Sequence, residues 1–414
     1  PQLGGPVSLT VNPRHRVALT VLVSALGYFV DIYDLILFAV VRKPSLQALG
    51  IAAADMESAG GMLISLQMAG MLTGGIIWGV MGDRLGRKST LFGSILVYSL
   101  ANLLNAGVTT LEQYAVLRFV AGLGLAGELG AAITLVSESM SAKNRGVGTT
   151  IVAAVGVCGA LLAAWVGKNF AWTTAYLIGG VLGLLLLALR FGTFESGLFD
   201  AAKQTNRPRG DLRMLLWPPK RLGRYLTVIA TGVPIWFSIG ILVVFANEFA
   251  KELRIQGEVT GATAVFWAYL GLGVGDLAAG LISQALRSRR KALLLFLALD
   301  VIALVVYCNA HDSTVQTFCW VLFLVGTANG YWAVFATTAA EQFGTNLRAT
   351  VATTAPNFVR GSLVAIEWGW KTLRPDLGRV GAAAWVGGAC LLLAVFAVWA
   401  MRESFDDQLD FYEE

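Results

Sequence analysis

Twelve long apolar stretches follow one another along this chain. A helix needs about 20 apolar residues to cross the hydrocarbon core of a membrane. The strands of a membrane barrel alternate apolar and polar residues, whereas these stretches are continuously apolar, so helices are predicted. The expected spans are residues 17–41, 59–81, 89–108, 112–137, 147–167, 171–191, 225–248, 260–284, 291–309, 314–340, 349–369 and 380–401. We therefore predict an all-α membrane protein with twelve transmembrane helices in two six-helix bundles.

The composition excludes several other classes of protein. Of the 414 residues, 56% are hydrophobic and 14% are charged. Typical soluble domains carry about 25% charged residues, so a soluble enzyme and a nucleic-acid binder are excluded despite the formal charge of +5. The apolar content also excludes a disordered chain. Because the cysteines and histidines lack metal-ligand spacing and no nucleophile–base pair appears, we expect no metal, no cofactor and no enzymatic activity.

The basic residues predict how the chain is oriented. The longest polar segment, 192–224, divides the chain into an expected N-terminal bundle, 1–191, and C-terminal bundle, 225–414. Of the 31 Lys and Arg residues, 21 lie on the side of both termini and of this segment, eight lie on the other side, and two lie within spans. By the positive-inside rule, we expect both termini on the cytoplasmic side of the cell (inner or plasma) membrane.

The two halves contain a repeat with an offset of 203 residues. Arg87 and Lys88 correspond to Arg290 and Lys291, each pair in the loop after the second span of its half. Glu138 and Arg145 correspond to Glu341 and Arg348, each pair in the loop after the fourth span of its half. The halves are therefore expected to be parallel repeats, with a binding site between them near the membrane midplane.

Several motifs resemble those of the major facilitator superfamily. Residues 82–88, Gly-Asp-Arg-Leu-Gly-Arg-Lys, match its signature loop. Residues 138–146 and their repeat at 341–350 resemble a motif of its sugar-porter and metabolite:proton symporter branches, as does the segment 118–128. Residues 31–34, Asp-Ile-Tyr-Asp, resemble the Asp-Gly-x-Asp motif of aromatic-acid:proton symporters, with Ile in place of Gly. The resemblance implies a monomeric transporter in a lipid bilayer that binds a small-molecule substrate.

Three acidic residues inside predicted spans are candidates for proton coupling. They are Asp31 and Asp34 on the first span and Glu128 on the fourth. A charge at the bilayer centre costs at least about 2.5–3.5 kcal/mol, so such residues are functional candidates. Two carboxylates three residues apart share a helix face and cannot both ionise cheaply, so one is expected to hold a proton near neutrality. The alternative is a structural salt bridge to a neighbouring helix.

Five residues are candidates for substrate binding: Arg360, Arg118, Asn357, Tyr331 and Trp236. The planar guanidinium of Arg360 can donate two parallel hydrogen bonds to a carboxylate. The alternative for Arg360 is a buried pair with Glu367 or an Asp that locks the halves together. For Arg118 it is the resemblance that implies a role, either in substrate binding or in control of the proton affinity of a carboxylate. The alternative is a side chain that reaches the outer headgroups.

The resemblance implies gating roles for two groups of residues in the loops. The signature loop is expected to act as an inter-helix latch, with Asp83 capping or bridging to the span 349–369. Glu138–Arg145 and Glu341–Arg348 are expected to form a symmetric pair of bridges. The predicted gating residues are Asp83, Arg84, Arg87, Lys88, Glu138, Arg145, Glu341 and Arg348. Asp276 is expected to be a packing or gate residue, and the sequence suggests no role for Asp300.

These features favour a secondary active transporter that moves a small organic anion together with a proton, since anion plus proton is neutral overall. The alternatives are a proton-coupled carrier of a sugar, polyol or zwitterion, and an exporter of the same superfamily. A solute sensor that does not transport is a further alternative of a different class.

Overall fold

The computed structural model describes residues 13–140, 145–190, 211, 213–405 and 411–413, with the side chains of 13–16, 87, 137, 145 and 146 outside the description. The first half contains α1 (Pro13–Ala48), α2 (Met56–Leu85), α3 (Arg87–Asn105), α4 (Leu111–Leu125), α5 (Glu128–Ser139), α6 (Arg145–Asn169) and α7 (Trp172–Leu189). The second half contains α9 (Arg213–Leu216), α10 (Pro219–Phe237), a π-helix (Ser238–Val243), α11 (Ala246–Glu252), α12 (Gly261–Ala285), α13 (Arg289–Cys308), α14 (Val315–Ala328), α15 (Trp332–Glu341), α16 (Arg348–Gly361) and α17 (Leu363–Ala400).

The described helices account for twelve spans. Ten helical runs are long and apolar enough to cross a membrane. One of them, Arg348–Ala400, has 53 residues and reverses direction at Gly378, whose φ of 70° favours glycine, so it contains two spans. The 19-residue helix α3 lies alongside the others and completes the set. The predicted all-α membrane fold is confirmed.

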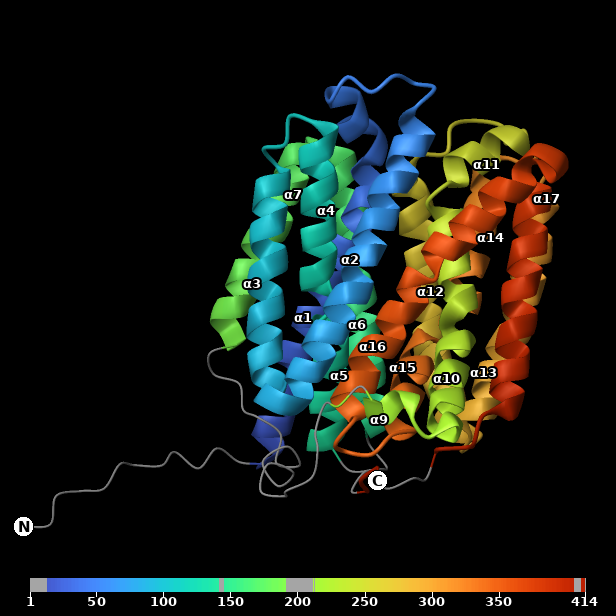
Figure 1. Ribbon diagram of the computed structural model, residues 1–414. Coiled ribbons are helices and arrows are strands. Elements are labelled where there is room, and N and C mark those ends of the chain that lie inside the picture. The colour runs from blue at the N-terminus through green and yellow to red at the C-terminus, as the bar shows by residue number, and fades with distance from the viewer. Residues whose placement is uncertain (1–12, 141–144, 191–210, 212, 406–410, 414) are drawn as a thin grey trace, which may run out of the picture.

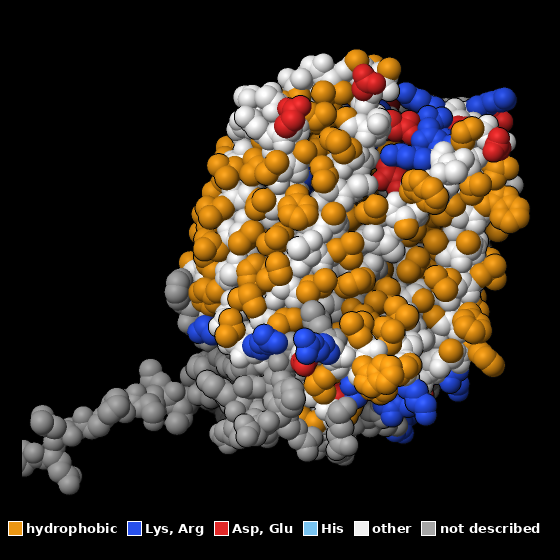
Figure 2. All heavy atoms as spheres, viewed as in Figure 1, with side chains coloured by type: hydrophobic (Ala, Val, Ile, Leu, Met, Phe, Trp, Pro, Cys, Tyr) orange, Lys and Arg blue, Asp and Glu red, His pale blue; other side chains and the backbone are white. Residues whose placement is uncertain are grey.

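The helices stand in two groups (Figure 1), which meet along α2 and α16 and also along α6 and α12. On the face drawn in Figure 2, apolar side chains form a belt between Lys and Arg side chains at one end and a mixed charged cluster at the other. We call the end at which α1 begins and the chain ends the terminal face, and the other end the opposite face (Figure 1). Because lipid solvates apolar side chains, such a belt marks the surface that faces the bilayer. Strongly exposed members include Trp165, Leu281, Trp385, Leu392 and Phe396.

Two of the predicted spans are broken helices. The sequence predicts continuous helices at 112–137 and 314–340, but α4 ends at Leu125 and α14 ends at Ala328, 203 residues later. Broken helices in membranes occur where other groups satisfy the freed backbone atoms. Asn357 Nδ2 donates to the Ala126 carbonyl at 2.7 Å, and Asp276 Oδ1 accepts from the Ala333 amide at 2.9 Å. The two breaks lie at equivalent positions, so the 203-residue repeat includes the interruption of the fourth span in each half.

Two helix ends also differ from the prediction. Helix α1 continues to Ala48, beyond the expected end at 41, and so carries Arg42 and Lys43 to the opposite face. Helix α10 begins at Pro219, inside the expected loop 192–224. Most of that loop, with Lys203, Arg207 and Arg209, lies outside the described residues. The domain boundaries at 191 and 225 therefore stay predictions.

Candidate functional site

A small cavity lies where the two helix groups meet. It has a volume of about 20 Å³ and is lined by Tyr28, Ile32, Ile235, Trp236, Ile239, Tyr269, Leu272, Trp332 and Arg360. These residues come from α1, α10, the π-helix, α12, α15 and α16. A volume of 10–15 Å³ or more admits about one water molecule. Binding of a larger solute therefore requires the groups to move apart.

Arg360 is the charged residue of this cavity, and its charge is only partly balanced. Its side chain is completely buried, and Nη2 lies 3.8 Å from Oδ2 of Asp31 on α1. Nη1 donates to Asn357 Oδ1 at 3.2 Å, but among the described residues Nε and Nη2 have no hydrogen-bond partner, and neither have the two carboxylate oxygens of Asp31. A buried charge without hydrogen bonds is costly. The site thus holds an Arg with free donors against an Asp with free acceptors.

The sequence suggests Glu367 or an Asp as a buried partner of Arg360, and the structure distinguishes between them. Glu367 lies closer to the opposite face, where it pairs with Lys371 at 2.7 Å and accepts from Ser65 Oγ at 3.0 Å. Asp31 is therefore the acidic partner of Arg360, and the pair joins the two halves. Asn357, also predicted to bind substrate, links the halves through the Ala126 carbonyl.

Aromatic rings surround the guanidinium of Arg360. Its Cζ lies 5.5 Å from the ring centroid of Trp332 and 5.9 Å from that of Trp236. Trp332 Nε1 donates to the hydroxyl of Tyr28 across the interface at 2.8 Å. Trp236 lies where the sequence predicts, but Tyr331 does not line the cavity, since its hydroxyl donates to the Thr231 carbonyl at 3.2 Å. The helix break turns Trp332 toward the cavity and its neighbour Tyr331 toward α10.

Asp34 and Arg118 lie inside the first half, away from the cavity. The Asp34 carboxylate packs against α7, in space that a side chain on Gly179 would fill, and Arg118 and Asn102 are near enough to act on its charge. Arg118 bonds to Gln67, donates to the Tyr176 hydroxyl at 3.5 Å and lies 4.8 Å from the Phe38 centroid. The two aspartates of the 31–34 motif therefore face different arginines.

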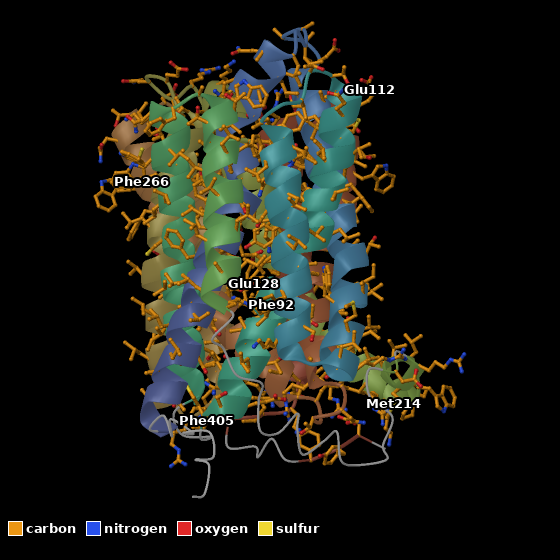
Figure 3. All side chains as sticks on the ribbon, turned by 90° about the vertical axis from the view of Figure 1, so that its left-hand side faces the viewer. Phe92, Glu112, Glu128, Met214, Phe266 and Phe405 are labelled. Atoms are coloured by element: carbon orange, nitrogen blue, oxygen red, sulfur yellow. The ribbon has the colours of Figure 1, made fainter. Side chains whose placement is uncertain are left out.

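Glu128 is paired with a residue that sequence reasoning missed. It lies about halfway along the bundle (Figure 3) and forms a buried ion pair with Arg190, at the end of α7. Gly27 of α1 makes room for this pair, because a side chain there would overlap both groups. Arg190 lies at the end of an apolar stretch, so the sequence alone suggests an exposed residue at the membrane surface. The available signal was that Glu128, without a base on its own helix turn, needed a buried partner.

On the terminal face, Asp83 lies where the sequence predicts. Its carboxylate accepts from the amide of Thr350 at 2.8 Å, from the hydroxyl of Thr350 at 2.6 Å and from the amide of Ala349 at 3.3 Å. These groups belong to the first turn of α16, whose unpaired amides and dipole favour an anion. A residue of α2 thus caps a helix of the other half.

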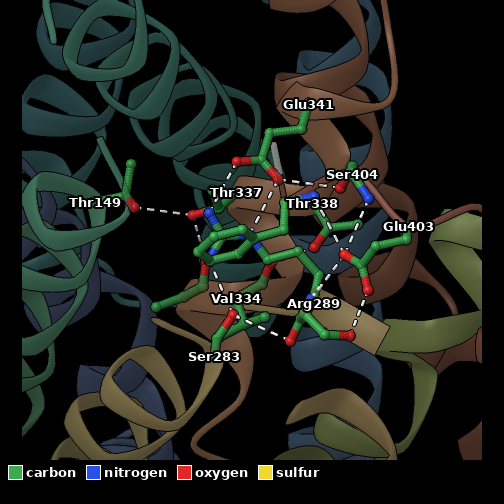
Figure 4. Close-up of polar contacts among 12 residues, drawn as sticks. Thr149, Ser283, Arg289, Val334, Thr337, Thr338, Glu341, Glu403 and Ser404 are labelled. Carbon is green, nitrogen blue, oxygen red and sulfur yellow. Dashed lines mark hydrogen bonds and ion pairs between the residues drawn. The ribbon is translucent and has the colours of Figure 1, made fainter. Parts of the chain in front are cut away.

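The acidic residues of the repeat contact arginines as follows. Arg348 lies 3.4 Å from Glu138, across the interface, and Glu341 forms a two-point pair with Arg289 at 2.9 and 3.1 Å (Figure 4). Thr149 and Thr337 add a 2.9 Å hydrogen bond between the halves (Figure 4). Contacts across the interface therefore close the terminal face.

Figure 4 also shows Glu403, which anchors the start of α13. Burial favours its neutral form, but hydrogen bonds from Ser288 Oγ and from the amides of Arg289, Ser404 and Arg290 lower the pKa of Glu403 below its ordinary value. The carboxylate thus stays ionised as a cap of α13.

The other predicted gating residues are less well defined. Arg84 is exposed, and Lys88 lies 5.8 Å from the ring centroid of Phe92. The side chains of Arg87 and Arg145 lie outside the described part of the chain. The gating roles of these four residues stay predictions, as do those of Asp83, Glu138, Glu341 and Arg348.

On the opposite face, the two halves are joined by ion pairs that sequence reasoning also missed. Arg42 of α1 pairs with Glu248 of α11 at 2.9 Å. Glu57 of α2 pairs with Arg374, and with Arg379 at 3.1 Å. Red and blue side chains gather at this end in Figure 2. The acidic residues in the same part of the sequence could have suggested these pairs. The count used to predict the orientation considered only Lys and Arg and therefore ignored them.

Removal of the Asp83 carboxylate is expected to loosen the terminal face. Asp83→Ala leaves the first amides of α16 uncapped, whereas Asp83→Asn keeps one acceptor oxygen. With the four native cysteines replaced, maleimide labelling of a Thr353→Cys probe, buried between the halves, should be at least about fivefold faster in Asp83→Ala than in the parent, because loss of a cap costs about 1 kcal/mol. Equal labelling rates would show that this contact does not hold the face closed.

A buried, charged site between two helix groups, closed at both ends, is the arrangement of a membrane transporter. The sequence profile of the Major Facilitator Superfamily matches residues 21–366. The chain belongs to this superfamily, and it is a multi-pass transporter and not an enzyme.

Similar proteins are known by sequence and by structure. The 3-(3-hydroxy-phenyl)propionate transporter of Escherichia coli is 29% identical over 384 residues, which cover 88% of this chain and 93% of that protein. The 4-hydroxybenzoate transporter of Pseudomonas putida is 32% identical over 203 residues, 48% of this chain and 44% of that one. Among solved structures, the proton:xylose symporter XylE has a TM-score of 0.73 at 15% identity, with 96% of this chain and 98% of that chain covered. The last likeness concerns the fold alone.

Proposed function

We propose that this transporter carries a small aromatic carboxylate together with a proton by alternating access. The observation that carries the proposal is the arrangement at Arg360, whose Nε and Nη2 face the bundle interface without hydrogen-bond partners in the described part of the chain. A carboxylate accepts two parallel hydrogen bonds from such a guanidinium fork. A substrate anion would therefore satisfy the donors that Asp31, at 3.8 Å, leaves free.

The other cavity residues favour an aromatic substrate. Trp236, Trp332, Tyr28 and Tyr269 present rings around Arg360, together with aliphatic side chains. Offset stacking between rings contributes about 0.5–1.5 kcal/mol beyond the area buried. A sugar needs a lining rich in amides and hydroxyls, and Asn357, on the same helix as Arg360, is the amide beside this cavity. Relatives named for aromatic acids agree with this choice.

Competition at Arg360 supplies a mechanism for proton coupling. When a substrate carboxylate binds Arg360, Asp31 loses its cationic partner and faces a second anion in a buried site. Both effects favour its neutral form, so Asp31 takes up a proton. The loaded site then holds Arg360 and the substrate as one pair, with Asp31 uncharged. A neutral complex avoids the cost of about 2.3 kcal/mol per charge per 100 mV during the transition.

Alternating access follows from the contacts at the two ends. The Asp83–Thr350 and Glu138–Arg348 contacts must break for the site to open at the terminal face, and the Arg42–Glu248 and Glu57–Arg379 pairs must break at the opposite face. The excess of basic residues supports a cytoplasmic terminal face in a bacterial inner membrane. We expect the protein to act as a monomer in the lipid bilayer.

Uptake into proteoliposomes tests this function. With the interior one pH unit more alkaline than the outside, labelled 4-hydroxybenzoate or 3-(3-hydroxyphenyl)propionate should accumulate up to about tenfold, the limit that this gradient sets for one proton per anion. Dissipation of the gradient with a protonophore should abolish accumulation but leave exchange intact. Labelled xylose and mannitol serve as controls. Gradient-independent uptake, or accumulation of the sugar alone, would contradict the proposal.

A further inference from the structure

Two buried carboxyl groups flank the break between α14 and α15, and the mechanism above uses neither. Asp276 of α12 accepts the Ala333 amide at 2.9 Å, in the first turn of α15. Asp300 of α13 accepts from Asn329 Nδ2 at 3.0 Å, at the end of α14. Asn329 Nδ2 also donates to the Val325 carbonyl of its own helix at 2.8 Å. Each side of the break is thus held by a carboxyl from a different neighbouring helix.

The break is also fixed by close packing. Gly330, at its centre, lies so near Gly275 of α12 that a side chain on Gly330 would overlap the backbone there. Such an approach needs glycine on both helices. The position of the break is therefore set by two helices outside the broken span, α12 and α13.

The break decides which aromatic side chain reaches the cavity. Trp332 begins α15 and lies beside Arg360, while Tyr331, one residue earlier, points to the Thr231 carbonyl of α10. In an unbroken helix the Ala333 amide would bond to the carbonyl of Asn329, four residues back. Asp276 removes the need for that bond. Without an acceptor at Asp276, the buried amide regains a partner when the helix straightens, which rotates Trp332 out of the cavity.

We propose that Asp276 and Asp300 are positioning residues that hold the α14–α15 break and thereby place Trp332 against the substrate ring. The transport measurement that tests this proposal rests on the function proposed above. The role requires an acceptor oxygen at each position and no negative charge. An Asn side chain, which retains a carbonyl oxygen of the same size and reach, should therefore replace either Asp.

A first experiment measures the position of Trp332 without any ligand. The protein is labelled with 5-fluorotryptophan, and the ¹⁹F resonance of Trp332 is identified as the one lost in Trp332→Phe. This resonance should shift in Asp276→Leu and keep its position in Asp276→Asn. Thr327→Val is the matched control, because the Thr327 hydroxyl beside the break bonds to Phe323 of its own helix at 2.9 Å. An unchanged Trp332 resonance in folded Asp276→Leu would overturn the proposal.

A second experiment measures transport of 4-hydroxybenzoate by the same variants. Asp276→Leu should raise KM about tenfold, which corresponds to about 1.4 kcal/mol of lost binding, with Vmax within about twofold of the parent. Asp276→Asn and Thr327→Val should keep both constants. Loss of uphill uptake in Asp276→Asn with exchange retained would overturn the positioning role, because it would make Asp276 a proton carrier.

Asp300 provides a second test from the other side of the break. If Asp276→Leu does not yield folded protein, Asp300→Leu should shift the Trp332 resonance and Asp300→Asn should not. Equal resonances in these two variants would contradict the proposal. If the parent transports neither 4-hydroxybenzoate nor 3-(3-hydroxyphenyl)propionate, the proposed function fails, while the resonance still decides the positioning role.

Discussion

Arg360→Gln is expected to weaken the binding of 4-hydroxybenzoate by about 100-fold or more. Truncation of one partner of a buried, hydrogen-bonded charge pair costs about 2–5 kcal/mol, and Gln cannot present two parallel charged donors to a carboxylate. Arg360→Lys should recover little of this loss, because an ammonium is a point charge without the planar fork. Isothermal titration of the purified protein in detergent measures the affinity.

Arg221→Gln is the matched control for this prediction. Arg221 is also a largely buried arginine, and it pairs with Glu413 at 3.1 Å on the terminal face, outside the cavity. Its substitution should leave the affinity within about threefold of the parent. Thermal unfolding of both variants checks that each is folded. An affinity of Arg360→Gln within threefold of the parent would reduce Arg360 to a structural role.

Asp31→Asn is expected to abolish uphill uptake while it preserves exchange. The amide cannot take up a proton, so the substrate would cross without one and the pH gradient would no longer drive accumulation. Under a gradient of one pH unit, the accumulation ratio should fall from about tenfold, the limit for one proton per anion, to about one. Counterflow of labelled against unlabelled 4-hydroxybenzoate should continue.

Two further substitutions sharpen this prediction. Asp376→Asn changes an exposed carboxylate in the α17 turn and should leave accumulation intact. Asp34→Asn tests the second aspartate of the motif, which faces Arg118 inside the first half. Coupling would have to be assigned to Asp34 if Asp34→Asn lost accumulation and Asp31→Asn kept it.

The sequence is informative about depth along a span and much less so about which neighbour a side chain faces. The cost of a buried charge marked Asp31, Asp34, Glu128 and Arg360 as candidates, and the repeat placed the site between the halves. Of the five predicted substrate-binding residues, Arg360 and Trp236 line the cavity and Asn357 bonds to Arg360. Arg118 and Tyr331 point elsewhere.

The remaining differences arise from contacts between distant segments. The partner of Glu128 is Arg190, 62 residues away, and Glu138 contacts Arg348 of the other half. The helix breaks depend on Asp276 and Asn357, which belong to other spans than the ones they interrupt. No local pattern in α4 or α14 contains that information, because hydropathy is the same for a broken and an unbroken apolar helix.

The most direct test of the exchange at Arg360 is the number of protons taken up when substrate binds. Titration of 4-hydroxybenzoate into the protein at pH 7.5, in two buffers that differ in ionisation enthalpy, gives this number at equilibrium. We predict an uptake of about one proton per ligand in the parent, since one carboxylate loses its partner, and an uptake near zero in Asp31→Asn. Binding without proton uptake in the parent, or equal uptake in the two proteins, would contradict the account.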